Sequence, residues 1–504
     1  MNVSPVDYSD VQGLVRFGYA SMTEACYLLV NVRQTAAARQ WLATAPITTA
    51  VKLHPPPKTA LQVAFTRQGL EALHVPQTLI AGFSAEFIAG IASDENRSRR
   101  LGDVGANSPA HWRWGNGDRV PHAVVMLFAE PGLLDSWKQS IKGQFWSVAF
   151  EEIECLPTSD MGGHEPFGFI DGISQPEIDW DQARKVPING YERKYSNQVS
   201  LGEFLLGYRN EYGRYTDRPL LDAQDPAASD LPVAEDYSGK KDLGRNGTYV
   251  VMRQLAQDVR GFWQFLDRAT NFRAEERYKL GSLMVGRAFA DGSPLVPLSR
   301  EAIPGITDQH NGIQQNQFTY DSDMDGTRCP YGAHIRRANP RNPDIPGDPK
   351  GLIPTLFRIL GFGNRNIRED LIASTRFHRI LRRGREYGRK VTPEEALQSA
   401  PLADGETGLQ FLAINSNIQR QFEFIQTAWL MRTKFDGMTE ESDPLLGNRT
   451  PVIGCPFTNT FSVPQSGKTR RRVMGLPQFI NVQGGAYFFL PGMSAVRYLG
   501  RLRD

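Results

Sequence analysis

The sequence has few cysteines and almost no net charge. Its 504 residues include only 4 cysteines, which form no CxxC pair and lie far apart, at Cys26, Cys155, Cys329 and Cys455. This spacing argues against a disulfide framework and against a structural zinc site. Lys and Arg number 57 and Asp and Glu 55, a net charge of +2, so the chain lacks the excess positive charge typical of nucleic-acid binding. We therefore expect small molecules as partners, and no nucleic acid.

Long apolar runs are missing as well. No segment approaches the roughly 18 apolar residues that cross a membrane. The first residues, MNVSPVDYSDVQGLVRFGYAS, lack the basic start and apolar centre of a secretion signal. These absences predict a cytoplasmic protein with no membrane partner, and they leave open whether it is a monomer or a homo-oligomer.

The chain does contain two similar successions of strands and helices. Its length exceeds the roughly 300 residues at which one hydrophobic core stops growing, so two domains or two halves of a duplicated unit are expected. Segments rich in β-branched and aromatic residues predict strands at 24–32, 60–66, 122–130, 146–153, 247–253, 407–414 and 479–490. Helical patterns predict helices at 79–92, 256–268, 274–288, 417–432 and 493–502.

Two polar stretches, 177–245 and 336–370, carry Pro and Gly repeatedly. The first indicates the junction between the halves. We therefore predict an N-terminal domain over 1–210, a connecting excursion over 211–245 and a C-terminal domain over 246–504. Loops as long as the second stretch are uncommon unless they are functional or cover something.

Three short segments carry residue types that suit redox chemistry, and the first is MGGHEPFGFIDGISQP at 161–176. Here Asp171 lies between glycines after a predicted strand. Such a setting lets the backbone approach a flat ligand closely and leaves a carboxylate partly desolvated. An isolated Asp-Gly pair is more often a simple turn, but the full string is more specific than the pair.

The second segment, CPYGAHIRRANPR at 329–341, contains His334 after two small residues, Gly332 and Ala333. Small residues permit close approach of a planar macrocycle, and neutral imidazole is a common axial ligand of haem iron. A single histidine among the 8 in the chain is more often a hydrogen-bonded structural residue. His334 is therefore a candidate only in combination with the other segments.

The third segment, FHRILRRGREYG at 377–388, places Arg382 and Arg383 after two apolar residues. A guanidinium is always charged and offers a rigid fork of donors, which suits the stabilisation of negative charge on a departing peroxide oxygen. The alternative is an ordinary solvated basic face.

Together, and in this order, the three segments resemble the dye-decolorizing peroxidases. Gly168, Asp171 and Gly172 match the Gly-x-x-Asp-Gly signature of that family, and the segments of His334 and Arg382 are similar to its proximal-histidine and distal-arginine segments. The likeness extends to DVQGLVRFGY near the N-terminus and to GLQFLAINSNIQRQFEFIQTAW at 408–429. The long stretch between His334 and Arg382 resembles the larger, intracellular members.

The resemblance implies an α+β fold of two ferredoxin-like domains, each an antiparallel β-sheet with packed helices. It also implies one haem b per chain, held in the C-terminal half. Asp171 would then reach the haem from the first half, and the active site would lie at the domain interface, a common location for cofactor pockets.

The activity implied is that of a haem peroxidase, which reduces hydrogen peroxide and oxidises dyes, phenols or other organic reductants through an oxyferryl porphyrin radical. His334 would be the fifth ligand of the iron, Asp171 would move the peroxide proton, and Arg382 would stabilise the charge of O–O cleavage. Arg383 is the second choice for that last role.

Further residues are expected to contact the cofactor. Leu409 and Phe411, in GLQF, match the apolar distal wall of the family, although they suit ordinary strand core equally well. Glu423, in QFEF, is the candidate carboxylate partner of the His334 ring, although it also suits an exposed helix position. Beside Asp171, the residues expected at the haem are Gly172, Ile173 and Gln175.

Two other classes of function fit parts of the same pattern. A haem-binding or iron-extracting protein would use the same pocket, with readily exchanged haem and negligible turnover. A ferredoxin-like module that has lost its cofactor would show no haem absorption near the Soret region. Retention of Asp171, His334 and Arg382 together argues against the module that has lost its cofactor. The motifs alone do not separate the enzyme from the haem carrier, and of these two we favour the enzyme.

Overall fold

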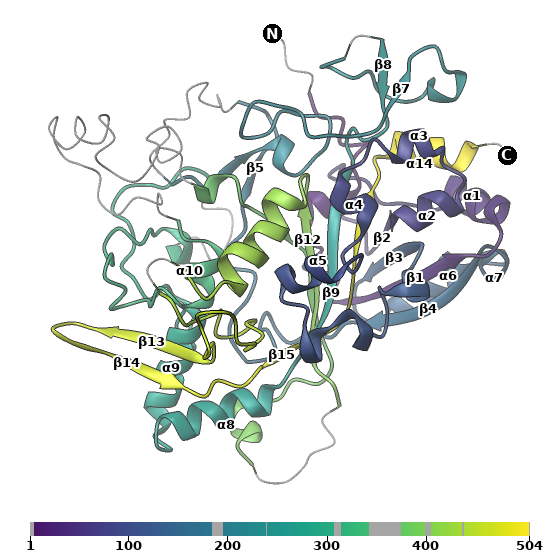
Figure 1. Cartoon of the computed structure of the whole chain (residues 1–504). Helices are drawn as coiled ribbons and strands as arrows, with labels where there is room; N and C mark the ends of the chain where they lie inside the picture. Colours follow the sequence, from purple (N-terminus) through teal and green to yellow (C-terminus); the bar gives the residue numbers. More distant parts are fainter. Residues whose placement is uncertain are drawn as a thin grey trace, which may run out of the picture.

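The computed structural model describes residues 5–183, 195–237, 239–306, 314–341, 374–398, 405–435 and 438–502. Its centre is one nine-stranded sheet in which the strands follow the order β10-β12-β9-β15-β2-β3-β1-β4, with β11 also paired to β12 (Figure 1). Every strand pairing within this sheet is antiparallel.

The sheet consists of two half-sheets with the same strand order. The first half contains β1 (Glu24–Val32), β2 (Thr59–Phe65), β3 (Ala123–Ala129) and β4 (Phe150–Pro157). The second contains β9 (Thr248–Gln257), β10 (Leu381–Arg382), β11 (Arg385–Tyr387), β12 (Gly408–Asn415) and β15 (Ile480–Leu490). In each half the second strand in sequence is an edge, the first lies between the third and the fourth, and helices connect them. This arrangement confirms the predicted pair of ferredoxin-like units.

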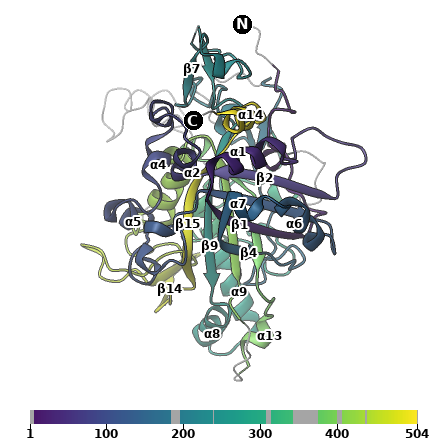
Figure 2. The ribbon, with the colours of Figure 1, turned by 90° about the vertical axis from the view of Figure 1, so that its right-hand side faces the viewer.

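The helices of the first half are α1 (Thr35–Thr44), α2 (Arg67–Ala72), α3 (Gln77–Ile80), α4 (Ala85–Ala89), α5 (Glu95–Leu101), α6 (Leu134–Lys142) and α7 (Trp146–Ala149). Those of the second half are α8 (Val259–Ala269), α9 (Ala274–Val285), α10 (His334–Ala338), α13 (Pro393–Ala396), α14 (Met493–Arg501) and two π-helical stretches, η9 (Gln419–Glu423) and η10 (Ile425–Met431). Helix α14 packs on α1, so the end of the described chain lies against the first half (Figure 2).

Smaller elements lie outside the main sheet. Three additional strand pairs are β5 (Glu177–Asp179) with β6 (Gln198–Ser200), β7 (Leu220–Asp222) with β8 (Lys240–Asp242), and β13 (Thr460–Gln465) with β14 (Lys468–Met474). Short 3₁₀ turns are η1 (Gly13–Val15), η2 (Gly105–Asn107), η3 (Pro109–His111), η4 (Gly117–Arg119), η5 (Leu201–Glu203), η6 (Pro226–Ala228), η7 (Gln314–Asn316) and η8 (Ser374–Arg376).

The main sheet is buried on both faces, which explains why its strands are rich in apolar residues rather than alternating. All seven residues of β3, for example, are buried. Helices cover one face, where side chains such as Leu28, Leu127 and Val251 form the larger core. The other face packs against residues 11–22 and 199–208, so part of the polar stretch 177–245 covers the sheet.

The structure corrects some predicted boundaries. The predicted strand 146–153 begins as α7, and β4 starts only at Phe150, because Trp146 packs on Trp41 of α1. The predicted helix 79–92 is two helices, since Ser84 accepts a hydrogen bond from Phe87 N and starts α4 afresh. Strand β9 runs on to Gln257, and Asp258 caps α8 by accepting from Gly261 N.

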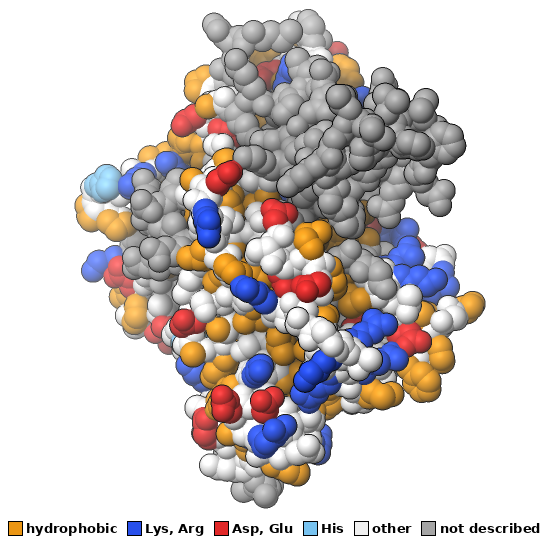
Figure 3. Space-filling model, turned by 90° about the vertical axis from the view of Figure 1, so that its left-hand side faces the viewer, with side chains coloured by type: hydrophobic (Ala, Val, Ile, Leu, Met, Phe, Trp, Pro, Cys, Tyr) orange, Lys and Arg blue, Asp and Glu red, His pale blue; other side chains and the backbone are white. Residues whose placement is uncertain are grey.

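The predicted excursion 336–370 lies outside the described residues from 342 onward. The domain boundaries 1–210, 211–245 and 246–504 stay a prediction, because β15 pairs with β2 and makes the two half-sheets continuous. Among the described residues, no helix is long and apolar enough to cross a membrane. The face on the side of β13 and β14 shows basic and acidic side chains interspersed (Figure 3), in keeping with the near-zero net charge.

Candidate active site

A deep cavity lies on the helix-covered face of the second half. Side chains of adjacent strands form its floor because alternate residues of a strand point to the same face. These floor residues are Arg253, Leu255 and Gln257 of β9, Leu409 and Phe411 of β12, and Ile480 and Val482 of β15. The space between the lining side chains measures about 1750 Å³, including the part open to solvent.

The loop that carries Asp171 reaches this cavity from the first half. It follows β4, and its two phenylalanines anchor it to the second half: Phe167 packs on Phe262 of α8 at 4.5 Å between ring centres, and Phe169 packs on Phe289 at 5.1 Å. Gly168 between them has φ +99°, and a Cβ there would lie 3.1 Å from the Phe289 ring. The glycine of the signature is therefore needed for both conformation and space.

Asp171 and Arg382 meet at the cavity. Arg382 Nη1 donates to Asp171 Oδ1 at 2.8 Å, and both residues line the cavity. Burial raises the pKa of Asp171, but the Arg382 charge and hydrogen bonds outweigh it, so the net pKa is lowered. The carboxylate is therefore ionised at neutral pH and able to accept a proton.

The side chain of Gln175 holds the backbone of Arg382 in place. Its side chain accepts from Arg382 N at 3.0 Å and donates to Arg382 O at 3.2 Å. The neighbouring Arg383 points elsewhere, since its guanidinium donates to Leu14 O at 2.9 Å and Val15 O at 3.2 Å. Of the arginine pair, Arg382 is thus the member that faces the cavity.

His334 is the first residue of α10 and also lines the cavity. Its Nδ1 lies 3.0 Å from Asp443 Oδ2, whose side chain is 0% exposed. Leu445 N and Leu446 N donate to the other oxygen of Asp443, at 2.9 and 2.8 Å. Burial lowers the pKa of His334, but the adjacent Asp443 carboxylate raises it by more. With Nδ1 taken by Asp443, the free ring nitrogen for a metal is Nε2.

The predicted partner of His334 is therefore wrong. Glu423 does not line the cavity; it accepts hydrogen bonds from Arg97 Nη1 at 2.9 Å and from the Tyr487 hydroxyl at 2.8 Å. The π-helical stretch η9 turns this carboxylate toward α5 and β15 instead. Asp443 was missed because it follows His334 by more than a hundred residues and its segment, ESDPLLG, carries no signal beyond a turn.

The other predicted cofactor contacts divide into two groups. Ile173, Leu409 and Phe411 line the cavity. Gly172 and Gln175 instead line a neighbouring polar pocket, which shares Ile173 with the main cavity. The loop that carries Asp171 thus forms a wall between the cavity and the polar pocket.

Positive charge gathers at one part of the cavity wall, where Arg287 and Arg379 are lining residues and Arg341 lies behind them. Arg379 donates to the Tyr195 hydroxyl at 2.9 Å, and Arg287 and Arg341 share Asn316 as an acceptor. Burial and the nearby charges of Arg341 and Arg382 lower the pKa of Arg287 to about 10. The Nε2 atom of His334, the apolar walls and the arginines at the wall together fit a haem, whose two carboxylates are anionic.

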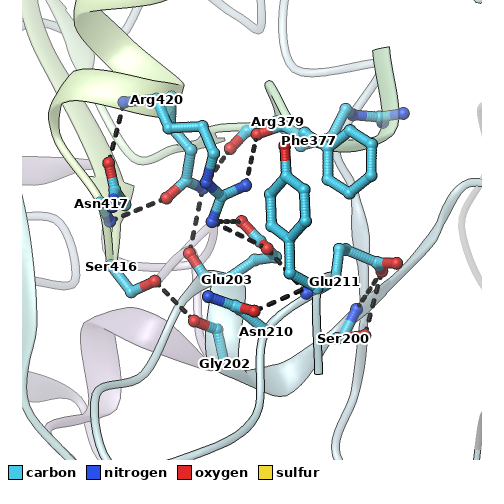
Figure 4. Close-up of polar contacts among 12 residues, drawn as sticks. Ser200, Gly202, Glu203, Asn210, Glu211, Phe377, Arg379, Ser416, Asn417 and Arg420 are labelled. Carbon is cyan, nitrogen blue, oxygen red and sulfur yellow. Dashed lines mark hydrogen bonds and ion pairs between the residues drawn. The ribbon is translucent and has the colours of Figure 1, made fainter. Parts of the chain in front are cut away.

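A buried ionic network supports the segment that leads into Arg382 (Figure 4). Glu203 is fully buried and accepts from Arg420 Nη2 at 2.9 Å. Arg420 Nη1 in turn donates to Phe377 O at 2.7 Å, and Gln421 donates to Arg379 O at 2.6 Å. Residues 377–379 are therefore fixed immediately before β10.

The chain is similar to known proteins. No protein-family model matches the chain. A dye-decolorizing peroxidase of Mycetinis scorodonius is 30% identical over 460 residues, which are 88% of this chain and 76% of the relative. A multifunctional dye peroxidase of an Amycolatopsis species is 30% identical over 359 residues, 68% of this chain and 62% of that protein.

The fold is also found in solved structures. A fungal DyP-type peroxidase from Auricularia auricula-judae superposes with a TM-score of 0.69 at 24% identity, over 99% of this chain and 100% of that one. An ancestral D-type dye-decolorizing peroxidase gives a TM-score of 0.70 at 24% identity, over 98% and 99% of the two chains.

The fold and site define a haem peroxidase, an enzyme that reduces hydrogen peroxide at the expense of a reducing substrate. This chain belongs to the dye-decolorizing peroxidase family.

Proposed function

We propose that this enzyme binds one haem b per chain through His334 and oxidises dyes, phenols or similar organic reductants with hydrogen peroxide. The observation that carries the proposal is the convergence of Asp171, Arg382 and His334 on one cavity. These three residues come from both halves of the chain, and the Arg382 charge acts on the pKa of both Asp171 and His334. The names of the relatives support dyes as the reducing substrates.

When bound, haem supplies the redox-active iron. His334 would ligate it through Nε2, while Asp443 accepts the Nδ1 proton and thereby fixes the ring orientation and makes the imidazole a stronger donor. Arg287 and Arg379, which line the cavity, would supply charge that suits the haem carboxylates. Leu409, Phe411 and Ile173 would pack against the macrocycle and exclude water.

Asp171 is proposed to move the peroxide proton. Because its carboxylate is ionised, it accepts a proton from hydrogen peroxide and returns it to the departing oxygen, as a positioned general base and acid. Arg382 stabilises the negative charge that develops on that oxygen. Its hydrogen bond to Asp171 also keeps the carboxylate ionised and oriented.

We further propose that the enzyme works in the cytoplasm. All four cysteines are free thiols, which suits a reducing compartment.

The proposal is tested by loading purified protein with haem and recording its Soret band and its rate of reaction with hydrogen peroxide. Wild type is expected to hold haem and react rapidly, whereas His334→Ala should lose or loosen the haem. Arg382→Leu should keep the haem and react slowly. Arg383→Lys is the matched control and should behave as wild type, because that side chain faces residues 14 and 15. Rapidly exchanging haem with negligible peroxide turnover in wild type would contradict the proposal.

A further inference from the structure

A second carboxylate, Glu165, lies at the cavity wall in the same loop as Asp171. Glu165 takes no part in the proposed proton transfer. It lies six residues before Asp171, in the string GHEPFGFIDG. Its enclosure raises its pKa to about 7, so keeping a carboxylate here has a cost that its contacts must offset.

Three donors converge on the Glu165 side chain. Phe169 N donates to Oε1 at 3.0 Å, and Phe167 N donates to Oε2 at 3.1 Å. Gln257 Nε2 donates to Oε2 at 3.0 Å. Two of these donors belong to the loop itself, and the third belongs to β9 in the second half.

The Glu165 backbone closes the same turn. Glu165 N donates to Phe169 O at 2.9 Å, and Gly168 N donates to Glu165 O at 2.8 Å. Asp171 N then donates to Gly163 O at 3.0 Å. Glu165 is therefore the centre of the hydrogen bonds that shape residues 163–171 and present Asp171 to the cavity.

We propose that Glu165 is a positioning residue: its carboxylate fixes the Asp171 loop and ties it to β9 through Gln257. The rings of Phe167 and Phe169 hold the loop on α8 by apolar packing. Such packing keeps the loop attached but allows it to shift slightly along the helix. The three directed hydrogen bonds at Glu165 add the orientation that packing lacks. This inference rests on the proposed role of Asp171.

An amide cannot replace this carboxylate. Both oxygens of Glu165 accept, whereas a glutamine has one acceptor oxygen and a donor NH₂. Gln257 Oε1 has no hydrogen-bond partner among the described residues, so in Glu165→Gln the Gln257 amide can turn over and accept from the new NH₂. The loss then falls on a backbone N–H, that of Phe167 or Phe169.

Amide hydrogen exchange of the protein without haem measures the loop directly. In Glu165→Gln we expect faster exchange than in wild type at Phe167 or at Phe169, whichever N–H loses its acceptor. Glu275→Gln is the matched control, since Glu275 is an exposed residue of α9, and it should leave this exchange unchanged. Unchanged exchange in Glu165→Gln would overturn the proposal.

Kinetics of the haem-loaded protein test the consequence for Asp171. Misplacement of a reacting group by about 1 Å costs roughly 100-fold in rate, so Glu165→Gln should slow the reaction with peroxide by about 10- to 100-fold. The KM for the reducing substrate should stay unchanged, because the position of Asp171 affects the reaction with peroxide and not the binding of the reductant. If the peroxide rate falls and the KM for the reducing substrate rises by the same factor, the variant has suffered general damage, and this result would count against positioning.

A second variant covers the case in which Glu165→Gln does not fold. Gln257→Leu removes only the bond to β9 and keeps both backbone bonds, so exchange at Phe167 and Phe169 should stay slow while the peroxide reaction slows. A wild-type rate in Gln257→Leu would refute the link to β9. If Asp171→Asn reacts normally, the proposed function fails, and exchange in Glu165→Gln still decides whether Glu165 holds the loop.

Discussion

At the scale of single residues, the site depends on pairs in which one side chain sets the charge of another. Arg382 lowers the pKa of Asp171 against the effect of burial, and Asp443 raises the pKa of His334 against the effect of burial. In each pair, one residue is placed to act and the other sets its protonation state.

The Asp171–Arg382 pair predicts a shift of the acid limb of the pH profile. In wild type the lowered pKa of Asp171 keeps it ionised, so the peroxide reaction should fail only at pH below the ordinary carboxyl range. In Arg382→Leu, the largest effect that opposes burial is lost and the pKa of Asp171 rises, so the acid limb should move to higher pH. In Asp171→Asn the acid limb should disappear, and the rate of the peroxide reaction should fall by about 100- to 10,000-fold. Stopped-flow rates between pH 3 and 8 check this, and an unmoved limb in Arg382→Leu would contradict it.

The His334–Asp443 pair predicts a change in the bound iron. Asp443→Asn weakens the acceptor for the Nδ1 proton, so His334 donates less charge and the Fe(III)/Fe(II) midpoint potential should become more positive. Loss of such a supporting carboxylate typically costs about 10- to 100-fold in metal affinity or activity. Spectroelectrochemical titration measures the potential. Glu423→Gln is the control, because Glu423 bonds Arg97 and Tyr487 instead; a larger shift in that variant would restore Glu423 as the partner.

At the scale of elements, a network far from the chemistry positions the strand that carries Arg382. Arg420 of η9 connects Glu203 to the backbone of Phe377. The polar stretch 177–245 therefore does more than join the halves, since its residue Glu203 anchors the approach to β10 (Figure 4).

This network predicts a strong effect on stability. Arg420→Met leaves the buried Glu203 carboxylate without its cation, and breaking a buried pair in this way costs about 3–5 kcal/mol. Urea unfolding followed by tryptophan fluorescence measures the loss. The double variant Glu203→Leu/Arg420→Met should recover most of it because no unpaired charge remains. A double variant no more stable than Arg420→Met would show that packing, not charge, dominates the cluster.

At the scale of the whole molecule, the proposed haem would contact both halves, since the cavity combines Asp171 from the first with His334 from the second. A ligand that binds the folded state alone stabilises it by mass action. The two half-sheets are already joined through β15 and β2, so haem would strengthen an existing unit.

Haem should therefore raise the melting temperature of the apoprotein in a concentration-dependent way. At a free haem concentration 100-fold above the dissociation constant, the gain is about 2.7 kcal/mol. Differential scanning calorimetry checks this. His334→Ala should show a much smaller rise at the same haem concentrations, and an equal rise would mean that His334 does not hold the haem.

Much of the fold was predictable because it is local. The seven predicted strands overlap β1, β2, β3, β4, β9, β12 and β15, since buried strands leave a contiguous apolar record in the sequence. Some errors fell at boundaries, where a cap such as Ser84 or Asp258 decides between continuing and restarting an element. Short strands such as β10 and β11 were not predicted.

By itself the sequence determined which residue types could do the chemistry, because Asp171, His334 and Arg382 lie in compact motifs whose neighbours are part of the signal. Tertiary structure decided which partners they have. Asp443 reaches His334 across more than a hundred residues, and Glu423 turns away because a π-helical stretch sets its direction. Adjacent side chains of a strand point to opposite faces, so only strand pairing could direct Arg382 into the cavity and Arg383 out of it.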